Sequence, residues 1–141
     1  MDDQSLAKHS LTPNLHLVLT SLTFIIPTTI AAYYQEWIHY AALLNLTIVS
    51  CLYHSTKNTT LFWLDQLACF ALVATTIRLS LLNNHRFVPI TASIYTLGIY
   101  YGGYYLKTFM WSTDKMVATL YHMSMHAVIN FTTCYVINKY Y

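Results

Sequence analysis

Long apolar segments separated by short polar breaks run through almost the whole chain of 141 residues. A helix needs roughly 20 mostly apolar residues to cross the hydrocarbon core of a bilayer. Five segments come close to that length, and the breaks between them are too short to hold a soluble domain. The predicted helices cover about 15–34, 38–54, 61–82, 88–106 and 116–137. The pattern therefore predicts an all-α fold, a polytopic transmembrane bundle of about five membrane-spanning helices, with residues 1–141 as a single transmembrane domain.

The composition agrees with a membrane location and excludes other classes. Charged residues make up 9% of the chain and hydrophobic residues 56%, whereas soluble proteins carry about 25% charged residues. A soluble fold of this composition would expose large apolar patches. Aromatic residues at 16% argue against disorder, and a net charge of +2 is too small to favour nucleic-acid binding. We expect a multi-pass integral membrane protein, in the endoplasmic reticulum or Golgi membrane if the cell is eukaryotic.

The distribution of lysine and arginine predicts the orientation. With the amino terminus inside, the inner side holds more basic residues than the outer side, which favours that orientation under the positive-inside rule. The inner residues are Lys8, Lys57, Lys107 and Lys115, and the outer ones are Arg86 and Lys139, with Arg78 able to reach toward the outer side.

Two local features predict details of helix packing. Pro27 lies within the first segment, where it is expected to kink the helix. Gly98 and Gly102 have the GxxxG spacing that allows two helices to approach closely.

Ionisable groups inside membrane segments are costly and by default mark functional sites. Asp65 is the only acidic residue within an apolar segment. His122 and His126 stand at i and i+4, so they share one face of the last helix in the spacing that offers two ligands to one metal ion. Ser50 and His54 have the same relation at the end of the second helix. His16 and His39 are expected at helix starts near the interface and are assigned no role.

The five-helix layout predicts that these polar groups converge at one depth in the membrane. The second helix ends at His54, and the third and fifth helices begin on the same side. Three neutral imidazoles with an open position are typical of catalytic zinc. Zinc makes hydroxide available at neutral pH. Asp65 is suited to orient the water and take its proton, and Ser50 to donate a hydrogen bond to the water or the oxyanion.

Two alternatives remain open on the residues alone. One is a non-catalytic membrane protein, a lipid-binding receptor or a scaffold, that keeps the zinc as a structural link. The other is a bundle without metal, in which the histidines make hydrogen bonds between helices.

The pattern Ser50-x-x-x-His54, then Asp65, then His122-x-x-x-His126 resembles the signature of the CREST superfamily of membrane hydrolases. That group includes the alkaline ceramidases and the Per1-like proteins, and the segment 50–67 looks most like alkaline ceramidase. The resemblance implies a zinc ion held by His54, His122 and His126, with Asp65 and Ser50 flanking its bound water. It also implies a zinc-dependent intramembrane hydrolase of lipid amide bonds with a ceramide-like membrane lipid as substrate.

The chain departs from that family in helix number. The family has seven membrane helices, and five are predicted here, so two helices are missing between Asp65 and the histidine pair. Losing an even number leaves the last helix entering from the same side, which preserves the metal site. The missing helices would form part of the substrate cavity, and a homodimer or another partner could supply that wall.

Overall fold

The computed structural model describes residues 13–82, 84 and 86–141, so Lys8 lies outside the described residues. Over those ranges the chain is helical and contains no strand. The α-helices are α2 (Leu15–Leu22), α3 (Ile25–Tyr33), α4 (Trp37–Thr56), α5 (Thr59–Leu82), α6 (Phe87–Leu97), α7 (Gly103–Leu106) and α8 (Lys115–Tyr140). A π-helical turn, Gly98–Gly102, joins α6 to α7, and a 3-10 turn, Phe109–Trp111, precedes α8. The all-α prediction is confirmed. The pair α2 and α3 corresponds to the first predicted helix, and the pair α6 and α7 corresponds to the fourth.

Local chemistry explains where the helices break and end. The first predicted helix is interrupted after Leu22, and Pro27 accounts for the break because its ring clashes with the carbonyl four residues earlier. Lys57 ends α4 in the left-handed conformation, with φ of 56°. Asp114 starts α8 because its side chain accepts hydrogen bonds from the backbone amides of Met116 and Val117.

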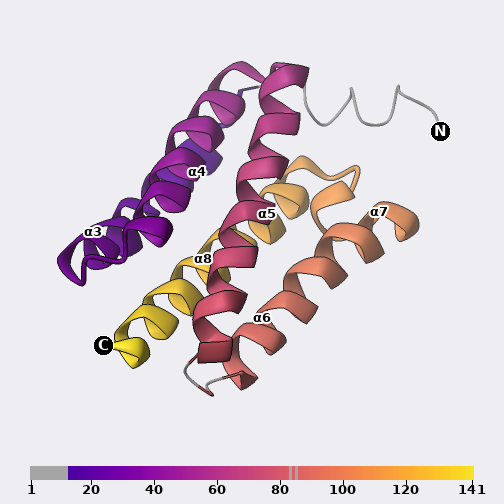
Figure 1. The fold of residues 1–141 in the computed structure, drawn as a ribbon. Helices are drawn as coiled ribbons and strands as arrows, with labels where there is room; N and C mark the ends of the chain where they lie inside the picture. The colour runs from indigo at the N-terminus through magenta and orange to yellow at the C-terminus, as the bar shows by residue number, and fades with distance from the viewer. Residues whose placement is uncertain (1–12, 83, 85) are drawn as a thin grey trace.

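The helix α4 packs along α5, and α8 contacts α2, α3, α5 and α6; in Figure 1, α5 crosses the middle of the view. In that view α3 and α4 lie on one side of α5, α6 and α7 lie on the other, and α8 passes behind. The hydrophobic core joins α3, α4, α5 and α8 with the residue between α2 and α3. Its buried members include Phe24, Leu43, Leu46, Leu72, Leu79 and Val136.

The side chains are distributed with apolar groups outside and many polar groups inside. Large apolar side chains are exposed along every long helix, among them Leu19, Ile48, Leu67, Ile94 and Phe131. The buried set contains Ser21, Thr28, His39, Ser50, His54, Asp65 and Thr76. Two segments are long and apolar enough to cross a membrane, Leu15–Tyr33 and Thr59–Leu82. The helices α4 and α8 contain the histidines and several amides, which lower their mean hydropathy.

The expected close helix contact at the GxxxG pair is wrong for the described structure. A Cβ atom added at Gly98 or Gly102 would meet nothing within 4 Å. The neighbouring Gly103 is the crowded position, because a Cβ there would lie 2.7 Å from the carbonyl oxygen of Thr108. The sharp reversal after α7 brings that backbone against Gly103, so the small residue serves a turn in the same chain.

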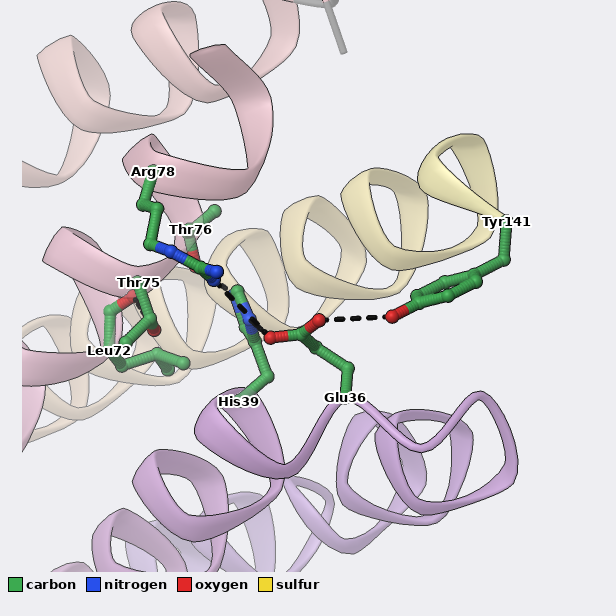
Figure 2. Close-up of polar contacts among 7 residues, drawn as sticks. All are labelled: Glu36, His39, Leu72, Thr75, Thr76, Arg78 and Tyr141. Atoms are coloured by element: carbon green, nitrogen blue, oxygen red, sulfur yellow. Dashed lines mark hydrogen bonds and ion pairs between the residues drawn. The ribbon is translucent and has the colours of Figure 1, made fainter. Parts of the chain in front are cut away.

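A polar cluster, composed of Glu36, His39, Arg78 and Tyr141, ties three helices together at the end of the bundle remote from His54 (Figure 2). The Glu36 carboxylate accepts a hydrogen bond from the Tyr141 hydroxyl at 3.0 Å and from the Arg78 guanidinium at 3.4 Å. The Nδ1 atom of His39 lies 3.8 Å from the same carboxylate. His39 is fully buried, whereas its place near a helix start favours an interfacial position.

Removing the Tyr141 hydroxyl is expected to lower stability by about 1 kcal/mol, because a hydrogen bond to a buried carboxylate is lost. The variant Tyr141→Phe keeps the ring that stacks on Tyr34. Tyr140→Phe is the matched control, since no hydrogen bond of the neighbouring hydroxyl is found in the described structure. Thermal or denaturant unfolding of the purified protein measures the difference, and equal stability of the two variants would contradict the role given to Tyr141.

Candidate metal centre

The centre begins with the last turns of α4. Ser50 and His54 are one turn apart on the buried face of that helix, and their exposed fractions are 1% and 0%. The backbone N–H of Asn14 donates a hydrogen bond to the backbone carbonyl of His54 at 3.0 Å. The Asn14 side chain also donates to the hydroxyl of Thr119 in α8 at 2.8 Å. One residue at the start of α2 thus holds the end of α4 beside the first turns of α8.

The other two imidazoles come from α8, where His122 and His126 lie one turn apart and face His54. The ring centroids of His54 and His122 are 4.8 Å apart, and those of His54 and His126 are 5.6 Å apart. The centroids of His122 and His126 are also 4.8 Å apart. His122 and His126, which follow His54 by 68 and 72 residues in the sequence, therefore meet it in one cluster, as the sequence predicts.

The donor set fits a metal ion. One nitrogen from each of the three rings can be chosen so that all three lie within 4.8 Å of one another. The Nε2 atom of His54 is buried and makes no hydrogen bond within the part of the chain that the structure describes, so it is a nitrogen that still needs a partner. A shared zinc with Zn–N distances of 2.0–2.1 Å requires nitrogens roughly 3–4 Å apart. The rings would therefore move together by about an ångström on binding.

Thr20 of α2 orients His126 for binding through Nε2. Its hydroxyl lies 3.0 Å from Nδ1 of His126 and donates its own proton to the backbone carbonyls of His16 and Leu17. With the hydroxyl proton on one of those carbonyls, the oxygen is able to accept the Nδ1 proton of His126, and in that tautomer the lone pair on Nε2 is free for a metal. Metal-binding histidines usually have such a partner on the second nitrogen.

Ser50 connects the histidines to the candidate base. Its hydroxyl is 3.0 Å from that of Ser21 and is close enough to Asp65 to donate a hydrogen bond to the carboxylate. Asp65 lies in the second turn of α5, is 4% exposed, and its Oδ1 atom has no hydrogen-bond partner among the described residues. The Asp65 carboxylate is thus held against α4 one turn before His54, through the hydroxyl of Ser50. Tyr100 is a further neighbour, within electrostatic range of Asp65.

Lys57 disfavours metal binding at His54, whereas Thr20 favours it at His126. Its Nζ atom lies 3.2 Å from Nδ1 of His54 and 4.6 Å from the ring centre of Tyr53. Burial lowers the pKa of Lys57 to about 8, with the Asp65 carboxylate opposing the shift. At neutral pH the ammonium form still dominates. It donates to Nδ1, which moves the ring proton to Nε2, and its positive charge repels a bound cation.

Replacing Lys57 by methionine is therefore expected to raise zinc affinity by about tenfold, the lower end of effects at groups that contact metal ligands. Lys107→Met is the matched control, because Lys107 also has a left-handed backbone and lies over a tyrosine ring. Competition with a chromogenic zinc chelator measures both affinities. An affinity of Lys57→Met at or below that of the control would show that the ammonium does not oppose the metal.

Sequence reasoning found the three histidines, Ser50 and Asp65 but missed Thr20, Ser21 and Lys57 as their neighbours. Thr20 and Ser21 lie in an apolar segment where hydroxyls usually bond their own helix, and only the rotation of α2 turns them inward. Lys57 was a clearer signal, since it lies three residues after His54. Comparison of the chain with protein-family models, with curated proteins and with solved structures finds no match.

Proposed function

We propose that the protein is a polytopic membrane protein and a zinc-dependent hydrolase of lipid amide bonds, with a ceramide-like substrate. The membrane location is supported by the apolar outer faces of the helices and by the buried polar groups, a distribution that suits lipid surroundings. The resemblance of the Ser50–His54, Asp65 and His122–His126 pattern to the CREST superfamily supports the reaction. Membership of that superfamily is part of the proposal.

The single observation that carries the proposal is the meeting of three imidazoles, those of His54, His122 and His126. One helical turn before His54, the Ser50 hydroxyl lies within hydrogen-bonding distance of the buried Asp65 carboxylate. Three neutral nitrogen ligands suit a zinc site that keeps one position open for water or substrate. A purely structural zinc site in proteins is more often closed by four ligands. Asp65 and Ser50 are close together, and neither is among the three residues that could hold the metal.

The residues have distinct roles in this chemistry. His54, His122 and His126 would hold the zinc, which when bound activates water and polarises a carbonyl. Asp65 accepts a proton from the attacking water and returns it to the amide nitrogen as the C–N bond breaks. Ser50 donates a hydrogen bond that orients the Asp65 carboxylate or the water. The products are a fatty acid and a lipid amine.

Metal removal tests the proposal on the purified full-length chain. We expect about one zinc per chain and release of fatty acid from a lipid amide, lost on chelation and restored by zinc. Ester and amide lipids with the same acyl chain, assayed in parallel, identify the bond that is cleaved. Hydrolysis that persists unchanged in chelator, or zinc far below one per chain, would contradict the proposal.

The burial of the cluster favours one second candidate, a lipid-binding protein or scaffold in which the zinc is structural. His54, Asp65 and His126 are at most 7% exposed, which limits access for a substrate. In that case zinc removal would lower stability, and substitution of Asp65 would leave function intact.

A further inference from the structure

A groove lies between the starts of α2 and α8, beside the cluster of histidines. Its volume is about 620 Å³, and it is lined by residues 13–16 and by α8 side chains between Lys115 and Met123. Asn14, one of the lining residues, contacts both the His54 carbonyl and the Thr119 hydroxyl. The groove therefore borders the candidate metal centre, and the chemistry proposed for that centre does not use it.

The groove offers the positive charge of Lys115 and the hydrogen-bonding imidazole of His16. Lys115 and His16 are exposed on its lining, and neither has an ion-pair partner among the described residues. The neighbouring Asp114 carboxylate is engaged by backbone amides at the start of α8. Lys57 lies within electrostatic range of Lys115, so the two ammonium groups repel each other. Because Asp114 and Asn14 cap the starts of α8 and α2, the attraction for an anion comes from the ammonium groups of Lys115 and Lys57.

The rest of the lining is apolar, which distinguishes a lipid from a free anion. Leu15, Met116 and Leu120 contribute side chains that are 68%, 72% and 54% exposed. A small anion such as phosphate gains nothing from such a wall, whereas an acyl chain attached to a charged headgroup covers both parts of the groove. The chemistry of the lining therefore fits an anionic lipid.

The helix geometry relates this groove to the reacting site. Lys115 and His122 are seven residues apart and lie on the same face of α8. Their backbones are separated by about 10 Å along the helix axis. A headgroup bound at Lys115 would thus place the bonds just below it near the histidines.

We propose that the groove between α2 and α8 binds the phosphate-bearing headgroup of an anionic lipid through Lys115 and His16, so that the preferred substrate is a phosphorylated lipid amide. The substrate assignment rests on the proposed hydrolase function, but binding to the groove does not require hydrolysis. The phosphate lies at the polar mouth, and one hydrocarbon chain of the lipid covers Leu15, Met116 and Leu120.

Binding of a matched lipid pair tests this assignment on the full-length chain in nanodiscs at low salt. The probes are a fluorescent N-acyl sphingosine 1-phosphate and the same lipid without its phosphate. We expect the phosphorylated lipid to bind about fivefold more tightly, the effect of one lysine on an anionic lipid. Lys115→Gln should remove that preference. Lys139→Gln, an exposed lysine at the other end of α8, should keep it.

Three results would overturn the assignment: equal binding of the two lipids, equal effects of Lys115→Gln and Lys139→Gln, or displacement of the lipid by inorganic phosphate as effective as by unlabelled lipid. The last would identify a site for free phosphate. His122→Ala separates this proposal from the hydrolase proposal, because it should keep the headgroup preference. If the wild-type protein prefers the phosphorylated lipid but hydrolyses no lipid amide, only the hydrolase proposal is contradicted.

Discussion

Replacing His122 by alanine is expected to reduce bound zinc from about one per chain to nearly none under purification conditions. Removing a partner that only supports a metal ligand costs 10- to 100-fold in affinity, so losing a ligand should cost at least about 100-fold. His122 is one of three imidazoles whose nitrogens lie within 4.8 Å of one another, and the remaining pair cannot hold zinc tightly. Elemental analysis of the purified protein and competition with a chelator measure the change.

Met125→Ala controls for the loss of a side chain in the same stretch of α8. It shortens a partly buried residue three positions later that is not in the histidine cluster, so it should retain zinc. Equal zinc content in wild type and His122→Ala would rule out a metal centre at this cluster. The histidines would then be interhelical hydrogen-bonding groups, the interpretation that requires no metal.

The histidine cluster was predictable because it depends on two regular features. The i, i+4 spacing fixes His122 and His126 on one face of a helix whatever its surroundings. The alternation of apolar segments and short breaks fixes which helix ends lie on the same side, and this brings His54 to the same level. Neither inference requires knowing how one helix is rotated about its axis relative to another.

The partners of these histidines depend on that rotation and could not be predicted. Thr20 contacts His126 because the break before Pro27 lets α2 run in its own direction and turn this face inward. Lys57 contacts His54 because its left-handed backbone turns the side chain back along α4. Each contact depends on an irregular backbone conformation, and the spacing of apolar residues along the chain does not reveal such a conformation.

The glycines of the π-helical turn after α6 illustrate the same limit. GxxxG spacing states that a helix could approach Gly98 and Gly102, but not that another segment is available to do so. The described structure has open space at both positions and close backbone contact at Gly103. The turn that follows α7 decides the contact, and its course depends on Thr108 and Phe109, both outside the glycine motif.

Asp65→Asn is expected to reduce lipid amide hydrolysis by about 10²- to 10⁴-fold while leaving zinc per chain unchanged. The amide cannot take a proton from water, and general acid–base catalysis contributes an effect of this size. Asparagine has nearly the shape of aspartate and can still accept a hydrogen bond from Ser50. The expected loss is therefore in the rate of the chemical step, and single-turnover release of fatty acid with saturating lipid measures it.

Asp114→Asn is the matched control, since asparagine is as good a helix N-cap as aspartate and Asp114 is an exposed cap. It should retain both zinc and activity. Full activity in Asp65→Asn would exclude this carboxylate as the base and favour the structural-zinc alternative. Loss of zinc together with activity would instead indicate that Asp65 supports the metal site, because an unpaired carboxylate near a cation also contributes to its affinity.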